Sequence, residues 1–238
     1  MKRIILIVLG FSAISSFGQK PVFKNPGIPS AKHFTITDQL ENGEYVCTDF
    51  QISLVEEGGK KYYKIVINEG SAFKSEIEMN VDDLTSFSEM RTNLRDNSID
   101  EHYFYKGNNL VHYFDHRKSI DKDFTISNNN IYSRCAYFIS FQGFPFALGN
   151  CVYFKTYMVK YGDALTMKLQ CIDKLEVEVE AGSFECYKLE LSVGGWQAAF
   201  APEKYYFYFS KDAPHQFVKY EEEMKDGSWF TNELVQQD

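Results

Sequence analysis

Hydrophobic and polar residues alternate with a period of two along much of the chain. Between residues 73 and 81, Ile77 and Met79 fall on one side of an extended backbone, and Glu76 and Glu78 fall on the other. This pattern is typical of a strand with one face buried and one face in water. The sequence therefore predicts a sheet with a dry side and a wet side.

Segments of this kind recur, and residues that favour turns separate them. The predicted strands are 44–55 and 60–68 around Gly58 and Gly59, then 73–81, then 102–106 and 110–114 around Gly107, then 151–159 and 164–172 around 160–163, and finally 204–210, 215–224 and 228–235, separated by 212–214 and 226–227. Consecutive strands with short turns predict antiparallel hairpins in sequence order.

One stretch has a helical period instead. Ile131, Arg134, Cys135 and Phe138 recur at the spacing of one helix face, behind the Asn-rich residues 128–130. We therefore predict one helix over residues 131–141. Sequential hairpins and a single helix predict a mainly β fold, a curved antiparallel sheet (half-barrel) with one short helix packed against it.

The hairpin "EVEVEAGSFECYKLEL", residues 176–191, has a regular first strand and an irregular second one. The turn is predicted at 181–183, where Gly182 supplies the unusual backbone conformation. Along the returning strand, the apolar positions change sides between Cys186 and Tyr187. A β-bulge at that point would keep one face of a curved sheet buried.

Three segments resemble a known family. They are "VEVEAGSFECYKLEL", "YYFYFSKDAPHQFVKYE" and "YSRCAYFISFQGFPFALGNCVYF", and the resemblance as a whole extends over roughly residues 40–224. They are similar to the exported bacterial domain-of-unknown-function family 3108, whose most specific motif is Ala-Gly-x-Phe. The chain departs from the family at Glu180, where Pro is more usual. The resemblance implies a half-barrel similar to the periplasmic lipoprotein carriers, and it implies no catalytic residues.

The N-terminus has the layout of a cleavable secretory signal. Lys2 and Arg3 precede an apolar run that is too short to span a bilayer, and small residues end it at Gly18. We predict a signal peptide at 1–18 and a single β-rich domain at 19–238, exported to the periplasm or the extracellular space without a membrane-spanning segment. Cleavage would leave 23 basic residues (25 minus Lys2 and Arg3) against 33 acidic ones. This balance argues against nucleic acid as a partner.

The chain has five cysteines, all of which follow the predicted signal peptide. An odd number leaves at least one without an intramolecular partner. If the turn at 160–163 closes its hairpin, Cys151 and Cys171 lie nearly opposite each other, which makes them candidate disulfide partners. The alternative is that the cysteines are buried thiols that act as small hydrophobic residues.

Sequence motifs of catalysis are absent. The chain has no GxSxG, HExxH, GxGxxG or P-loop motif, so we expect a protein that is not an enzyme and has no cofactor. His102 and His112 flank the Gly107 turn near Asp115 and could face each other, but their aromatic neighbours favour an ordinary hairpin. Asp121 and its neighbours lack the spacing of a calcium loop. No metal site is predicted.

Aromatic residues are the strongest functional signal that remains. One group lies around the predicted helix and its Gly- and Pro-containing end, and the other lies on a late strand; the predicted ligand-binding residues are Phe138, Phe141, Phe144, Phe146, Tyr205, Phe207 and Phe209. They suit an apolar small molecule or lipid bound in the concave face of the sheet. The alternative is a structural or protein-interaction module of the cell envelope with a filled core.

Overall fold

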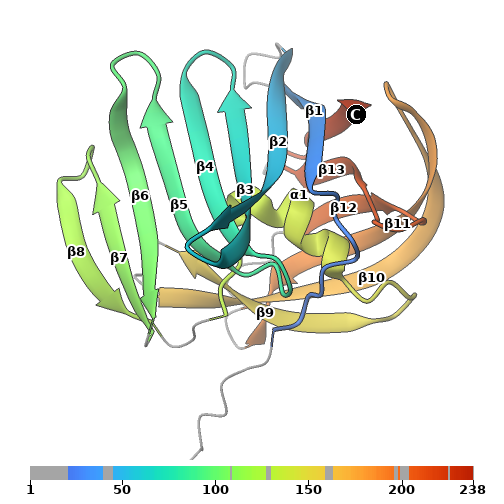
Figure 1. Ribbon diagram of the computed structural model, residues 1–238. Helices are drawn as coiled ribbons and strands as arrows, with labels where there is room; N and C mark the ends of the chain where they lie inside the picture. Colours follow the sequence, from blue (N-terminus) through green and yellow to red (C-terminus); the bar gives the residue numbers. More distant parts are fainter. Residues whose placement is uncertain are drawn as a thin grey trace, which may run out of the picture.

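Fourteen antiparallel strands form one continuous sheet in the computed structural model (Figure 1). The structure describes residues 21–39, 45–107, 109–126, 130–158, 163–195, 198, 204–224 and 226–237. The predicted signal peptide lies outside these residues.

The strands follow the chain from one hairpin to the next. Their bounds are β1 Ala31–Gln39, β2 Tyr45–Glu57, β3 Lys60–Glu69, β4 Phe73–Asn80, β5 Ser86–Asn93, β6 Ser98–Gly107, β7 Leu110–Asp115, β8 Ile120–Thr125, β9 Cys151–Met158, β10 Asp163–Val179, β11 Gly182–Val193, β12 Lys204–Ser210, β13 Phe217–Glu223 and β14 Trp229–Gln237.

The order of strands across the sheet places the first and the last strand side by side near its centre. The order runs from β8 down to β1, continues with β14, and then runs down to β9, so β8 and β9 are the edges. The register of the central pair opposes Thr37 and Glu233. The predicted mainly β fold, with a curved antiparallel sheet in the form of a half-barrel, is confirmed.

Alternating burial follows the predicted pattern. Ile77 and Met79 of β4 are fully buried, whereas Glu76 faces outwards and forms an ion pair with Lys64 at 2.8 Å. Strands β1, β5 and β8 were not predicted, because residues 86–93 and 120–125 carry polar residues on both sides and residues 31–39 are short of large apolar ones.

The predicted helix is present but is short and irregular. It consists of the 3-10 turn Arg134–Ala136, the α-helix α1 Tyr137–Ser140 and a second 3-10 turn Phe141–Gly143. The start predicted at residue 131 is wrong, because Ile131 bridges to Lys155 of β9 in an extended conformation. The cap is Ser133, whose Oγ accepts a hydrogen bond from the backbone N of Cys135 at 3.1 Å.

The helical segment and the N-terminal segment fill the inside of the curve. Figure 1 shows α1 between the part of the sheet formed by β3–β8 and the part formed by β9–β12. We call residues 131–146 the plug and residues 21–30 the strap. The strap lies against the plug, since Lys24 N donates to Gly143 O at 3.2 Å.

The bulge in the long hairpin lies on the opposite strand from the one predicted. Register shifts in β10 between Cys171 and Asp173, whereas Cys186 and Tyr187 of β11 pair without interruption with Ser210 and Phe209. The turn lies at Glu180 and Ala181, one residue before the predicted start, because Gly182 and Ser183 already pair with Val179 and Glu178. Gly182 begins β11 with a φ of 128°, a conformation that side chains other than glycine rarely adopt.

The candidate disulfide between Cys151 and Cys171 does not form. In the β9–β10 register, Cys151 opposes Gln170, one residue from the expected partner. Because side chains alternate between faces, this slip puts Cys151 on the exposed side, while Cys171 is buried. All five cysteines are free thiols.

Candidate functional site

The concave face of the sheet has an aromatic half and a polar half. Strands β12 and β13 and the plug contribute the aromatic half, and β5–β7 contribute the polar half. The seven predicted ligand-binding residues all belong to the aromatic half. Phe207 and Phe209 point inwards from β12, and Tyr205 shares their side of the strand because side chains alternate.

The plug aromatics pack on this strand. Phe141 lies with its ring centroid 5.1 Å from Phe207, and Phe138 lies 6.0 Å from Phe207 and 4.5 Å from Phe217 of β13. Phe146 contacts Phe209 at 5.9 Å. These are contact distances for rings, so the side chains themselves occupy the space between the plug and the sheet.

The burial of these rings also indicates that side chains fill the space between the plug and the sheet. Phe141 and Phe209 are fully buried, and Phe144 and Phe207 are each only 3% exposed. Phe138, Phe146 and Tyr205 are half-buried and pack against the same core; Phe144 lies 5.4 Å from Phe146, and Tyr205 stacks with Tyr220. The structure therefore brings the seven predicted residues into one cluster.

Several members of this cluster were not predicted. Phe23 of the strap is fully buried and packs 4.7 Å from Tyr132 and 5.3 Å from Phe154 of β9. The hydroxyl of Tyr132 accepts hydrogen bonds from the backbone N of Val22 and of Phe23. The strap was missed because Phe23 is an isolated aromatic residue in a Pro- and Gly-containing segment with no periodic pattern.

The polar half lies where β5, β6 and β7 turn their inner face to the plug. In the register, Arg91 opposes Glu101, which opposes Asp115, and Glu89 opposes Tyr103. The sequence had drawn attention to the histidines of these strands instead. The alternation is regular, but it did not reveal which side of each strand faces inwards.

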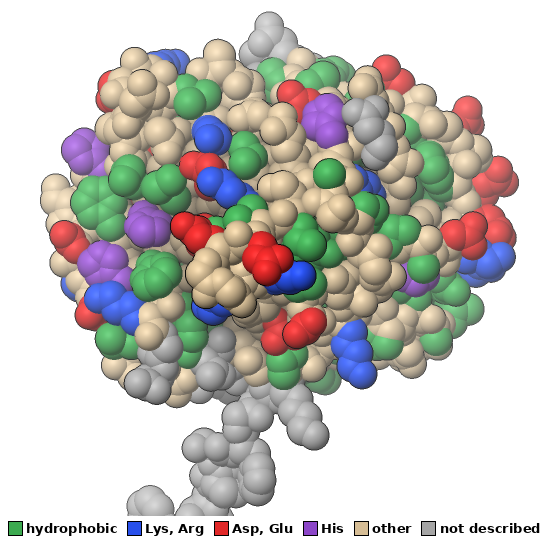
Figure 2. All heavy atoms as spheres, in the orientation of Figure 1, with side chains coloured by type: hydrophobic (Ala, Val, Ile, Leu, Met, Phe, Trp, Pro, Cys, Tyr) green, Lys and Arg blue, Asp and Glu red, His purple; other side chains and the backbone are tan. Residues whose placement is uncertain are grey.

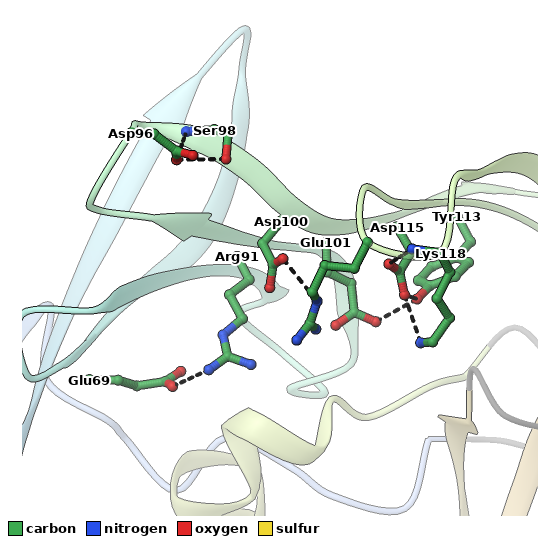
Figure 3. A network of polar contacts seen from close by, with 10 residues as sticks. Glu69, Arg91, Asp96, Ser98, Asp100, Glu101, Tyr113, Asp115 and Lys118 are labelled. Atoms are coloured by element: carbon green, nitrogen blue, oxygen red, sulfur yellow. Dashed lines mark hydrogen bonds and ion pairs between the residues drawn. The ribbon is translucent and has the colours of Figure 1, made fainter.

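Figure 3 shows how Arg91, Glu101 and Asp115 connect with their neighbours. Arg91 donates to Glu69 at 2.7 Å, and Tyr113 lies 2.7 Å from Glu101 and 2.8 Å from Asp115. Burial alone would raise the pKa of Asp115, but hydrogen bonds from Lys118 and Tyr113 outweigh it and hold the pKa at about 2. Asp115 is therefore ionised in the folded protein.

A second group of contacts joins the polar half to the plug. Ser133 Oγ donates to Oε2 of Glu89 at 2.5 Å, and Tyr103 and Cys135 face the same carboxyl group. Burial raises the pKa of Glu89, although the donors around the carboxylate oppose this effect. Burial and the proximity of Glu89 also raise the pKa of the Cys135 thiol.

These contacts limit what Ser133 and Cys135 can do chemically. A nucleophilic cysteine needs a lowered pKa, and that of Cys135 is raised. The hydroxyl of Ser133 donates to Glu89 and accepts from the backbone of Cys135, so it acts as a helix cap. The arrangement suits the positioning of the plug better than covalent catalysis.

The histidines considered from the sequence lie on the outer face of the sheet. His102 opposes Phe114, and His112 opposes Phe104. His112 contacts Asp123 at 2.9 Å and Asp121 at 3.4 Å. Among the residues that the structure describes, no group of three or more His, Cys, Asp or Glu side chains is arranged to hold a metal ion.

The outer surface differs from one side of the molecule to the other. Figure 2 shows histidine and hydrophobic side chains together at the left, over β6–β8, and acidic side chains at the right. Ile99 and Phe104 on β6 are 43% and 41% exposed. On the β10–β11 hairpin, Glu176, Glu178 and Glu185 are exposed.

A surface depression of about 710 Å³ lies beside the strap. It is lined by Pro21, Phe23, Lys24, Asn25, Gly27, Asp82 and Asp83. None of the seven predicted aromatic residues lines it. No described helix is long and apolar enough to cross a membrane.

Comparisons with known proteins leave the family open. No protein-family model matches the sequence, so the resemblance to family 3108 is not confirmed, and no curated protein matches it.

Three solved structures are similar in outline. A β-barrel-like protein of domain of unknown function 1849 from Brucella abortus is 6% identical, with a TM-score of 0.47, and the match covers 88% of this chain and 97% of that chain. A "putative lipoprotein" from Parabacteroides distasonis is 12% identical, with a TM-score of 0.36 and coverage of 92% and 100%. A "putative exported protein with YmcC-like fold" from Bacteroides fragilis is 10% identical, with a TM-score of 0.33 and coverage of 91% and 99%.

Proposed function

We propose that this chain is a non-enzymatic exported protein of the cell envelope that acts as an interaction module with a filled core. The observation that carries this proposal is the occupied concave face. Phe141 and Phe209 are fully buried and Phe207 is 3% exposed, and the plug rings touch the strand rings. An apolar carrier would need space at this place.

Export is supported by the signal-like sequence at 1–18, with the periplasm or the extracellular space as the destination. Mass spectrometry of the protein isolated from its native cells tests this. We expect a mature chain that begins at Gln19, and a chain that keeps its first eighteen residues or carries an acyl group contradicts it.

An interaction module must present its binding surface on the outside. Phe104, Tyr153 and Trp229 are suitable positions for a test, because they are large hydrophobic residues with exposures between 41% and 48%. A photo-reactive amino acid at each position should give discrete crosslinked products in cells from at least one of them. Absence of products from all three positions contradicts the proposal.

The second candidate is a carrier of an apolar or acyl ligand. It is favoured by the gathering of all seven predicted aromatic residues on one face. It requires the plug to move, because the plug stands where the ligand would bind.

A fluorescent fatty acid distinguishes the two functions. The interaction module predicts no saturable binding and no lipid extracted from the purified protein. The carrier predicts binding that Phe207→Asp abolishes and that Tyr206→Asp preserves, because Tyr206 is the adjacent residue on the same strand and points to the outer face.

A further inference from the structure

Strand β10 is longer than the edge strand β9 that lies beside it. Strand β9 begins opposite Gln170, and the last backbone contacts on this side are those from Cys171 N to Asn150 O and from Gly149 N to Cys171 O, both at 2.9 Å. Along residues 172–179, β10 pairs with no described strand other than β11. The second half of β10 is therefore itself an edge, and it rises at the right of Figure 1.

The geometry of the β10–β11 hairpin determines which backbone groups of this edge are free. Val179 opposes Gly182 across a two-residue turn, so these two residues exchange backbone hydrogen bonds. Such pairs alternate with pairs that are not hydrogen-bonded along an antiparallel ladder. The N–H and C=O groups of Glu176 and Glu178 are therefore directed away from β11, where they can pair with a further strand.

The part of this edge nearest to β9 is protected against such pairing. The register of β10 shifts between Cys171 and Asp173, and Asp173 Oδ1 accepts a hydrogen bond from Lys174 N at 2.7 Å. A bulge and a backbone donor that is already used both hinder the approach of a partner strand. This protection ends at Lys174.

The outer edges of the sheet have their own protection. On β8, Lys122 opposes the buried Tyr113, so a charged side chain points to the inner face of the edge strand. On β9, Ile131 bridges to Lys155 and covers part of the edge. Residues 175–178 of β10 have neither an inward-pointing charge nor a covering segment in the described part of the chain.

The side chains of this segment differ between its two sides. Leu175 and Val177 lie on one side; Leu175 is 36% exposed, whereas Val177 is 8% exposed and belongs to the core. Glu176 and Glu178 lie on the other side and are exposed. Because Leu175 has no neighbouring strand on its open side, an added strand would cover it.

The charges of Glu176 and Glu178 are not balanced by a basic side chain among the described residues. Lys174 and Lys211 approach Glu185 instead, at 3.6 and 2.8 Å. Glu185 opposes Glu176 in the register, so the exposed side of the hairpin is acidic at its open edge. A partner with basic residues at this edge would supply the missing charge.

We propose that residues 174–178 are a docking edge for an extended segment of another protein, which adds an antiparallel strand to β10. Directly opposed side chains lie on the same face, so the segment has basic residues opposite Glu176 and Glu178 and aliphatic residues opposite Leu175 and Val177. The docking edge rests on the interaction function proposed above, for which it specifies the partner.

A second copy of this chain fits the same edge less well. In a two-fold pairing of β10 with itself, each residue opposes a residue of the same parity. Any such pairing that uses both Glu176 and Glu178 places at least one pair of glutamates directly opposite each other. Like charges in that position are destabilising, whereas a basic segment avoids this repulsion.

A synthetic peptide provides a direct test. The probe is Thr-Lys-Val-Lys-Val-Glu-Thr with a fluorophore at its N-terminus, which places its lysines opposite Glu178 and Glu176 and its glutamate opposite Lys174. Fluorescence anisotropy with the full mature chain should show saturable binding. The charge-reversed peptide Thr-Glu-Val-Glu-Val-Lys-Thr is the matched control and should bind at least about tenfold more weakly, because each opposed charge pair becomes repulsive.

N-methylation of the peptide separates strand addition from charge attraction. In the docked peptide the N–H groups of the lysines point to β10, and those of the valines point away. N-methylation of the second lysine should weaken binding at least about tenfold, because Glu176 O loses its donor, whereas N-methylation of the valine after it should not. In NMR spectra, the unmodified peptide should slow amide hydrogen exchange at Glu176 and Glu178.

Variants of the protein test the position of the site. The double variant Glu176→Lys with Glu178→Lys should reverse the preference between the two peptides. Glu180→Lys is the matched control, because Glu180 is an exposed glutamate in the adjacent turn and lies outside the edge. It should keep the preference of the wild type.

Several results would overturn the docking edge. They are absence of saturable binding, equal binding of the two peptides, equal effects of N-methylation at lysine and valine, and an unchanged preference in the double variant. A wild-type dimer that the double variant abolishes also contradicts it, since a second copy would then occupy the edge. If the double variant fails to fold, the N-methylated peptides still decide with the wild type.

A photo-reactive amino acid at Leu175 distinguishes failure of the docking edge from failure of the interaction function. We expect crosslinked products in cells from Leu175. Products from Phe104, Tyr153 or Trp229 without any from Leu175 would overturn the docking edge and leave the interaction function standing. Absence of products from all four positions would contradict both.

Discussion

Gly143 is the residue at which the plug passes closest to the strap. A Cβ atom built there would lie 2.5 Å from the backbone O of Lys24 and 2.9 Å from its N. Backbone atoms cannot move aside as the end of a side chain can. The close approach explains why the last turn of the plug ends in glycine.

We therefore expect Gly143→Ala to destabilise the protein by about 1–3 kcal/mol, as overpacking commonly does. Gly194→Ala is the matched control, because its added Cβ would meet side-chain atoms of Thr166 and Tyr153 at 3.2 Å. Urea denaturation measures both. A smaller loss for Gly143→Ala than for Gly194→Ala would show that the strap backbone yields.

Glu89 gives a prediction about stability and pH. Burial raises its pKa in the folded protein, so folding favours the protonated form, and stability falls as the pH rises from the unfolded pKa to the folded one. Glu89→Gln removes this loss. At about pH 7 the variant should exceed the wild type by about 1.4 kcal/mol for each unit by which the pKa is raised.

Denaturation of both proteins at about pH 4 and about pH 7 checks this prediction, since other titrating groups cancel in the difference. The gap should be small in acid and larger near neutrality. A gap of the same size at both pH values would mean that the amide acts through packing. A wild type that is more stable at neutral pH would mean that its hydrogen bonds outweigh burial.

At this scale the sequence revealed the aromatic cluster better than the polar one. Phe207 and Phe209 alternate with residues of the opposite face, and period-two alternation is enough to place them together. Glu89 and Glu101 also alternate, but a charged residue on a strand normally marks the wet face. Their inward position depends on the plug and β9 lying against them, which no local pattern records.

The strap contributes a fully buried ring to the core although it is short. It has no regular secondary structure, yet Phe23 is fully buried among Tyr132, Phe141 and Phe154. Asn25 continues the attachment, because its backbone N donates to Asp82 O and its amide to the Tyr63 hydroxyl. The strap thus connects the plug with β3 and the turn after β4.

We expect Phe23→Ala to reduce the free energy of unfolding by about 3 kcal/mol or more, the usual cost of removing a fully buried phenyl ring. Lys24→Ala is the control, because the Lys24 side chain is exposed and only its backbone contacts the plug. Thermal unfolding followed by circular dichroism compares them. Equal melting temperatures would indicate that the strap detaches without cost.

The ends of the strands show where a local sequence pattern is enough to predict the structure. The strands β2, β3 and β4 begin and end close to the predicted residues, since Gly-containing turns and regular alternation agree there. The β9–β10 register was predicted one residue away, because the turn at 160–163 fixes it only loosely and the partner strand continues beyond the hairpin. Because of this shift by one residue, Cys151 and Cys171 lie on opposite faces of the sheet and remain free thiols.

The whole molecule is closed at its centre by the pairing of β1 with β14. A chain ended after Ser228 would lack β14 and leave β1 and β13 as two new edges. We expect this chain to lose cooperative unfolding and to aggregate, because unpaired strands in the middle of a sheet expose both backbone and core. A chain that ends at Val235 is the control, because Gln236 and Gln237, the last residues that the structure describes, are exposed.

Circular dichroism and size-exclusion chromatography measure the outcome. The shortened chain should lose its sharp thermal transition and elute as aggregates, and the control should behave as the full chain does. A monomeric and cooperatively unfolding chain without β14 would mean that the two parts of the sheet are independent folding units.

The pairing of β1 with β14 also determines when the sheet can be completed during synthesis of the chain. Thr35 pairs with Gln236, so β1 leaves the ribosome about 200 residues before its partner exists. Until then β1 has a neighbour on one side only. The sheet can be completed only after synthesis of the last strand, so a chain exported as proposed would still lack its central pairing during most of its synthesis. During the same interval the unpaired edge of β1 and the apolar face beside it stay exposed, which is the condition in which incomplete chains aggregate.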